Sequence, residues 1–127
     1  MPRRIDASDG MPLLGKAARD GVAKLTRSDA KAAARFCLEE LAERHPGHSV
    51  EVRVPFAGAV QAIEGPKHRR GTPPNVVEMD ATTWLRLCVG DTTWQEMLDS
   101  ASVSASGIRA DLHEYLPLFT KAVLDRW

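Results

Sequence analysis

The chain has 127 residues, enough to bury one hydrophobic core, and its 43% hydrophobic and 27% charged residues are ordinary for a soluble globular domain. The 17 basic and 17 acidic side chains cancel, which argues against a nucleic-acid binder because such proteins carry a basic excess. No apolar run approaches the ~20 residues of a membrane span, and residues 1–14 lack a signal-peptide stretch. We therefore expect no integral membrane association and a cytoplasmic location.

The beginning of the chain has no sustained hydrophobic period. Residues 1–26 are predicted to form a partly mobile N-terminal arm, with about ten residues as a tail. Within this arm, Lys16–Lys24 is either a short helix or an extended segment. Residues 27–127 are predicted to form the folded domain.

The first helix is predicted over Arg27–Arg44. Thr26 and Asp29 resemble a capping box at its start, and Pro46 and Gly47 follow its end. Four apolar residues have the i, i+3, i+4, i+7 spacing of a single helix face: Ala34, Cys37, Leu38 and Leu41.

Three strands are predicted next, over Ser49–Val54, Ala59–Ile63 and Asn75–Met79. In the first strand, valine at every second position alternates with Glu51 and Arg53, which indicates one buried face. The short turn Pro55–Gly58 implies that the first two strands are antiparallel. Between the second and third strands, the Pro- and Gly-rich segment Glu64–Asn75 is predicted to be irregular.

The last third combines short helices with a strand of small residues, Ser102–Ser106. A helix is predicted over Ala81–Val89, between an Asp80 N-cap and Gly90. A second helix begins at a capping box formed by Thr93 and Glu96. A third is predicted from the apolar spacing of Ile108, Leu112 and Tyr115 or Leu116. Pro117 interrupts it or starts the last helix, whose inward side chains are predicted to be Phe119, Val123 and Leu124.

Three pieces of the chain carry a resemblance to a known family. They are VRVPFAGAVQAIEGPKHRRGTPPNVVEMD (Val52–Asp80), WLRLCVGDTTWQEML (Trp84–Leu98) and VSASGIRADLHEYLPLF (Val103–Phe119). Together they resemble the sterol carrier protein 2-like superfamily, and within it the small bacterial sterol carrier orthologues. The resemblance covers about residues 30–119.

The resemblance implies an α+β fold with a mainly antiparallel four- to five-stranded sheet that helices cover on one face. In ligand-binding members of the superfamily, an apolar tunnel between sheet and helices holds acyl chains, sterols or lipid precursors. The present chain departs from that pattern because only four strands have a clear signal and because the Glu64–Asn75 connection is long.

Large apolar side chains on the predicted helices are candidates for a cavity wall, although such stripes more often form core. The candidates are Trp84, Leu85, Met97, Leu98, Leu112, Leu116, Phe119 and Val123. The basic run that includes His68, Arg69 and Arg70 is a candidate for binding a polar head group, because arginine forms bidentate hydrogen bonds. A solvated loop is the alternative.

No catalytic, metal or cofactor motif is evident. Cys37 and Cys88 lack metal-ligand spacing and are predicted to be buried thiols. Of the four histidines, His45 and His48 flank one turn, and no third metal ligand is evident beside them. Neither a nucleophile elbow nor a phosphate-binding glycine motif occurs.

The favoured function is therefore non-enzymatic binding of a hydrophobic small molecule or acyl chain. The alternative is an interaction module with a filled cavity that docks a protein partner or a second copy. An enzyme with an unrecognised site, near His68 or His113, is a third reading.

Overall fold

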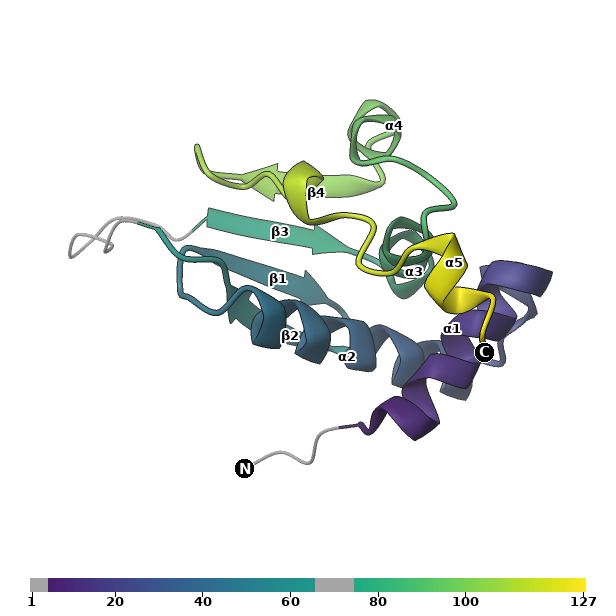
Figure 1. The fold of residues 1–127 in the computed structure, drawn as a ribbon. Helices are drawn as coiled ribbons and strands as arrows, with labels where there is room; N and C mark the ends of the chain where they lie inside the picture. The colour runs from purple at the N-terminus through teal and green to yellow at the C-terminus, as the bar shows by residue number, and fades with distance from the viewer. Residues whose placement is uncertain (1–4, 66–74) are drawn as a thin grey trace.

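A four-stranded open sheet organises the molecule, and the computed structural model describes residues 5–65 and 75–127 of it (Figure 1). The strands are β1 (Val50–Val54), β2 (Gly58–Ala62), β3 (Asn75–Met79) and β4 (Val103–Ser106). Their order in the sheet is β2-β1-β3-β4. The β1–β2 and β3–β4 pairs are antiparallel, whereas β1 and β3 are parallel. The α+β prediction is confirmed, with the correction that the sheet is mixed.

The helices of the described residues are α1 (Ala7–Asp20), α2 (Arg27–Arg44), α3 (Ala81–Val89), α4 (Trp94–Asp99) and α5 (Lys121–Leu124). Two single 3₁₀ turns, η1 (Val22–Lys24) and η2 (His113–Tyr115), accompany them. The predicted caps are confirmed: Thr26, Asp80 and Thr93 each accept a backbone N–H at the start of α2, α3 and α4. Gly90 ends α3 in the left-handed conformation, with φ of 83°.

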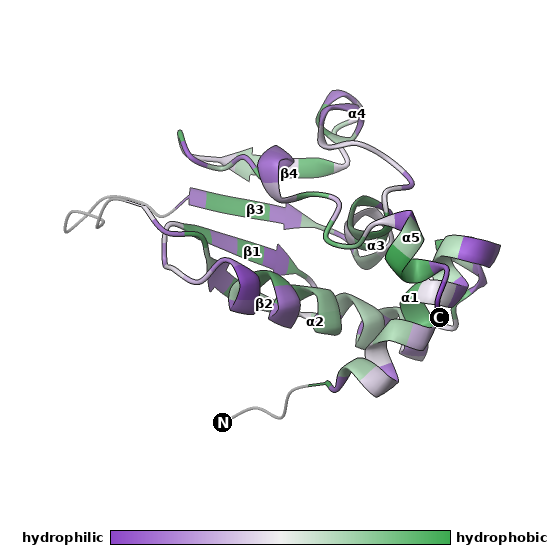
Figure 2. Ribbon diagram, in the orientation of Figure 1, coloured by the Kyte–Doolittle hydropathy of each residue, from purple (hydrophilic) through white to green (hydrophobic). Residues whose placement is uncertain are grey.

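One face of the sheet is buried beneath the helices. In β1 and β3 every second residue is buried while the residues between them are half-buried or exposed. Figure 2 shows the hydrophobic middle of β3 between hydrophilic neighbours. Helix α2 packs against β2 and against α3, so the helical layer and the sheet enclose one core.

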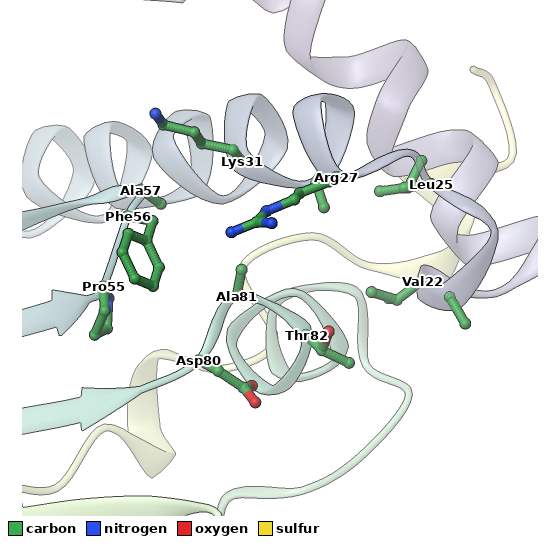
Figure 3. A pocket seen from close by; sticks show the side chains of 12 residues that line it. Val22, Leu25, Arg27, Lys31, Pro55, Phe56, Ala57, Asp80, Ala81 and Thr82 are labelled. Atoms are coloured by element: carbon green, nitrogen blue, oxygen red, sulfur yellow. The ribbon is translucent and has the colours of Figure 1, made fainter.

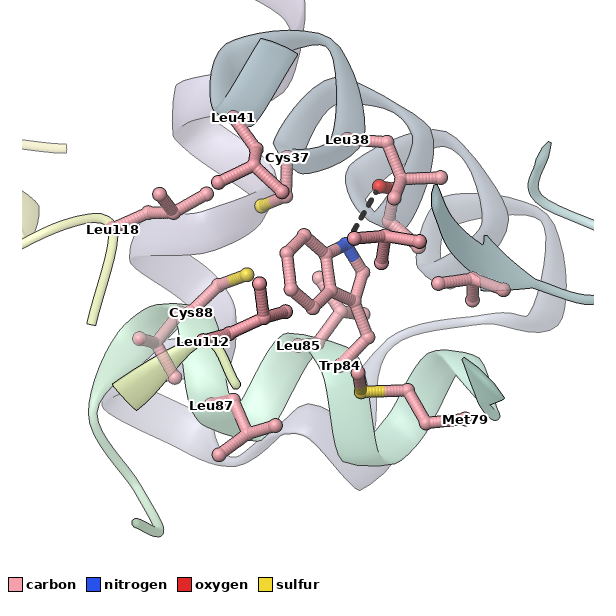
Figure 4. Close-up of a cluster of buried hydrophobic side chains, with 14 of the residues drawn as sticks. Cys37, Leu38, Leu41, Met79, Trp84, Leu85, Leu87, Cys88, Leu112 and Leu118 are labelled. Carbon is pink, nitrogen blue, oxygen red and sulfur yellow. Dashed lines mark hydrogen bonds between the residues drawn. The ribbon is translucent and has the colours of Figure 1, made fainter. Parts of the chain in front are cut away.

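The interior is filled around Trp84, which is fully buried between α2 and α3 (Figure 4). Its indole Nε1–H donates a 3.1 Å hydrogen bond to the carbonyl oxygen of Ala34, which satisfies the only polar atom of the ring. Phe36 stacks on Phe119 with ring centroids 6.1 Å apart, and this contact joins α2 to the C-terminal segment.

The N-terminal prediction requires a correction. Residues 7–20 form α1, whose Met11, Leu14 and Ala17 are buried in the core. Gly10, Pro12 and Gly15 break the helical signal in the sequence, yet the two glycines let α1 approach its neighbours closely. The described part of the arm is therefore helical and packed, and the domain boundary at residue 26 stays a prediction.

The C-terminal prediction is also wrong in part. No helix runs from Ile108 to Leu116. Ile108 is 99% exposed, and the only regular turn in this stretch is η2. The Asp111 carboxylate accepts the His113 backbone N–H at 2.9 Å, a local bond that competes with helix formation. Val123 is 40% exposed and does not face inward, whereas Leu124 is buried.

Candidate functional site

A groove opens where β1 and β3 end. Because these neighbouring strands are parallel, the segments after them, Pro55–Ala57 and Asp80–Thr82, meet at the same edge of the sheet. Ligands in open α/β sheets commonly bind at the carboxyl ends of strands. The groove encloses about 490 Å³, within the range of roughly 300–1,000 Å³ usual for small-molecule sites. We call it the Phe56 groove; it is lined by Val22, Ala23, Leu25, Arg27, Ala30, Lys31, Pro55, Phe56, Ala57, Asp80, Ala81 and Thr82.

The β1–β2 turn holds Phe56 at the lip of the groove (Figure 3). The Ala57 N–H donates to the Val54 carbonyl at 2.9 Å and closes a four-residue turn with Pro55 at its second position. Phe56 occupies the third position with φ of 69°, a conformation that favours glycine. Its side chain is 84% exposed. An aromatic residue in this conformation, exposed beside a groove, indicates a functional constraint more than a folding one.

The opposite wall comes from η1 and the start of α2. Val22 and Leu25 are buried at its base, and Ala30 lines the wall from the first turn of α2. Most side chains that line the groove are apolar, so displacement of water by an apolar ligand would favour binding here.

Two cations and one carboxylate provide the charged part of the groove. Arg27 and Lys31 lie one helical turn apart on α2. Within the described residues neither has an ion-pair partner. One carboxylate oxygen of Asp80 already has a hydrogen bond, since Oδ1 accepts the Thr83 N–H at 2.8 Å. The groove therefore offers unpaired positive charge beside an apolar surface.

The eight predicted cavity residues lie elsewhere. Trp84, Leu85 and Leu112 are fully buried in the core, and Met97 and Phe119 are nearly so. Leu98 and Leu116 pack against the core from partly buried positions, whereas Val123 is exposed. None of the eight lines the Phe56 groove. Their role as a cavity wall stays a prediction.

Phe119 alone among these candidates lines a second hollow, of about 550 Å³, between the end of α1 and α5. The head-group candidates His68, Arg69 and Arg70 lie outside the described residues.

Sequence reasoning missed the lining residues of the groove. Phe56 lies in a stretch that the sequence marks only as a turn, and Arg27 and Lys31 read as the solvated face of a helix. A signal was present in Pro55-Phe56, because a turn of this kind normally has glycine after proline.

The two cysteines meet in the interior, where their side chains point toward each other from α2 and α3 (Figure 4). Burial raises the pKa of the Cys88 thiol well above its ordinary value, and a hydrogen bond with Cys37 raises it further. The Cys88 thiol is thus unsuited to nucleophilic chemistry.

Metal and membrane sites find no support in residues 5–65 and 75–127. This part of the chain contains no group of three or more His, Cys, Asp or Glu side chains able to hold a metal ion. None of its helices is long and apolar enough to cross a membrane.

Residues 26–118 match the family described as Bacterial SCP ortholog. The chain belongs to this family. No curated protein matches it. The bacterial SCP unit contains α2, the whole sheet, α3 and α4, whereas α1, η1 and α5 lie outside it. The Phe56 groove is therefore lined mostly by residues within the matched range, whereas Val22, Ala23 and Leu25 lie outside it.

Proposed function

We propose that the protein binds a hydrophobic small molecule in the Phe56 groove and does not catalyse a reaction. The observation that carries this proposal is Phe56 itself, a large apolar side chain held exposed in a left-handed turn at the lip of an apolar groove. Membership of the bacterial SCP family supports it, because carriers are the typical members of the superfamily.

The expected ligand is amphipathic. Its apolar part would lie over Val22, Leu25 and the Phe56 ring, and each Å² of apolar surface removed from water contributes roughly 25 cal/mol. A carboxylate or similar anionic end would be held by Arg27 and Lys31. A fatty acid has both features.

Native mass spectrometry of the protein purified from its own cells tests the proposal directly. A stoichiometric mass adduct that extraction identifies as a lipid-like molecule is the expected result. An apo mass that does not change after incubation with fatty acids and sterols would contradict it.

A pair of variants locates the ligand. Phe56→Gly removes the ring and suits the left-handed turn, so it should weaken binding of a dansylated fatty acid while the protein stays folded. Ile108→Gly is the matched control, because Ile108 is also an exposed apolar residue but lies at the other end of the sheet. Equal effects of the two substitutions would place the ligand elsewhere.

The second candidate function is an interaction module, and the filled interior favours it. Trp84, Leu85 and Leu112 occupy the space between sheet and helices, as expected for a fold whose tunnel has closed. Sedimentation analysis would support this function if it shows a stable dimer, whose interface should bury over ~1,000 Å². If the protein is a monomer at all concentrations, the partner of an interaction module must be a different protein.

The cytoplasm remains the proposed compartment. Two cysteines that are both buried as free thiols fit a reducing environment.

A further inference from the structure

A second cleft lies at the edge of the sheet opposite to the Phe56 groove. It encloses about 320 Å³ and is formed where β1 begins and where β2 and β4 end. We call it the Ser49 cleft; its lining residues are Ser49, Ile63, Glu64, Ile108, Arg109, Asp111, His113, Glu114 and Tyr115. Its lining is mostly polar, unlike that of the Phe56 groove.

The floor of the cleft holds the side chain of a buried serine. Ser49 is only 4% exposed, and its side chain has no hydrogen-bond partner among the described residues. Gly65 packs against it so closely that an added Cβ would lie 2.6 Å from the Ser49 Oγ. Because Ser49 lines the cleft and its hydroxyl makes no hydrogen bond to a described residue, the hydroxyl is available to a molecule that binds there.

A second buried polar residue fixes the two sides of the cleft. The Asn75 Nδ2 donates to the Ser49 carbonyl at 2.8 Å, and its Oδ1 accepts the Arg109 N–H at 3.1 Å. Gly107, with φ of 107°, lets the chain pass close to Asn75, since an added Cβ would lie 2.3 Å from the Asn75 Oδ1. The start of β1 and the segment after β4 are thus held in a preformed arrangement.

The electrostatics of the cleft favour a cation. Among the described lining residues, Glu64, Asp111 and Glu114 oppose the guanidinium of Arg109, which gives these residues a formal charge of −2 with His113 neutral. The His113 Nδ1 lies 3.1 Å from both Asp111 carboxylate oxygens, so the imidazole is oriented and its Nε2 faces away from that pair.

We propose that the Ser49 cleft binds a small polar molecule that carries a primary ammonium group and a hydroxyl. The ammonium group pairs with the carboxylates of Glu64 and Glu114, which are outside any described ion pair. The ligand hydroxyl completes the hydrogen bond of Ser49. This inference does not depend on the Phe56 groove, because the two sites share no residue.

Three probes of similar size test the ligand class by amide chemical-shift mapping of the full chain. Ethanolamine carries the ammonium and the hydroxyl, ethylene glycol replaces the ammonium with a second hydroxyl, and glycolate replaces it with a carboxylate. Saturable shifts at Ser49, Arg109 and His113 with ethanolamine, and none with ethylene glycol, are expected. Equal or stronger shifts with glycolate would overturn the proposal and assign the cleft to an anion held by Arg109.

Substitutions then test the residues. Glu114→Gln changes an exposed side chain and should weaken ethanolamine binding about two- to fivefold, as expected for one ion pair near the surface. Ser49→Ala should weaken it as well, without loss of folding because no hydrogen bond is removed. Glu78→Gln, an exposed carboxylate on β3 outside the cleft, is the matched control and should have no effect. Equal losses for Glu114→Gln and Glu78→Gln would show nonspecific attraction and overturn the proposal.

Discussion

At the scale of single residues, local preference and observed conformation disagree at Phe56. A turn with Pro55 at its second position normally has glycine in the left-handed third position. The protein instead has a large aromatic residue there, 84% exposed and with φ of 69°. Since the exposed ring contributes little to the core, folding alone does not explain its presence, and this is why we assign Phe56 to the proposed ligand site.

The free-energy cost of the left-handed conformation at Phe56 can be measured. Phe56→Gly should raise the free energy of unfolding by about 1 kcal/mol, because glycine adopts the left-handed conformation without strain and little packing is lost. Urea denaturation measures the change. Phe56→Ala is the control, since it removes the ring but keeps the strain and should give no gain. A glycine variant less stable than the alanine variant would refute the strain argument.

Trp84 is the opposite case, a residue whose environment favours folding. Its ring is fully buried and its Nε1–H is bonded to Ala34. Trp84→Ala should therefore destabilise the protein by about 3–5 kcal/mol, as expected for a core aromatic side chain. The half-exposed Trp127 is the control, and Trp127→Ala should cost much less. A small loss for Trp84→Ala, accompanied by lost ligand binding, would identify Trp84 as a cavity wall.

At the scale of elements, α1 shows how small residues determine packing. A Cβ on Gly10 would lie 2.4 Å from the ring of Phe36, and one on Gly15 would lie 2.8 Å from the backbone of Trp127. These glycines reduce the helix propensity of α1 but let it contact α2 and α5. The helix is therefore formed by its tertiary contacts more than by its own sequence.

This interpretation predicts the sign of one substitution. Gly10→Ala should gain roughly 1 kcal/mol of helix propensity but lose more through overpacking, because Phe36 is buried against Phe119 and cannot move freely. We expect a net loss of about 1–2 kcal/mol in thermal or urea unfolding. Lys16→Ala, at an exposed position of the same helix, should be close to neutral. A stabilised Gly10→Ala variant would mean that α1 packs less tightly.

At the scale of the whole molecule, the two sites lie at opposite edges of one sheet and differ in character. The parallel β1–β3 pair brings two chain segments to the Phe56 groove. The antiparallel pairs bring the end of β2 and the segment after β4 to the Ser49 cleft. The filled core between the edges separates an apolar, positively charged groove from a polar, negatively charged cleft.

That core also predicts how stability depends on pH. Burial raises the pKa of Cys88 in the folded state, so the unfolded chain releases this proton first as pH increases. The free energy of unfolding should be unaffected by Cys88 well below its ordinary pKa of 9.0 and should fall above it. The contribution approaches about 1.4 kcal/mol per pH unit. Cys88→Ala should show a shallower decline in urea unfolding between pH 8 and about pH 10.5. Parallel curves for the two proteins would contradict this assignment.

The regular elements could be predicted where local signals agreed. Helices α2 and α3 begin and end at their predicted residues because caps and apolar spacing coincide there, and β3 was located by its valines. The prediction of a helix over Ile108–Leu116 was wrong because apolar residues at helical spacing also occur in irregular segments that pack on the core. In that segment Leu112 is buried while Ile108 faces solvent.

The sequence by itself determined the family, the α+β class and the apolar residues of the core, because these follow from local periodicity and from motifs that persist along the chain. Only the tertiary structure decided which strands are parallel, and thereby which distant segments share an edge. Both candidate sites depend on that decision. The two residues of each site are far apart along the chain, Phe56 from Arg27 in the groove and Ser49 from Arg109 in the cleft. No local pattern connects them, and the sheet brings each pair to one place.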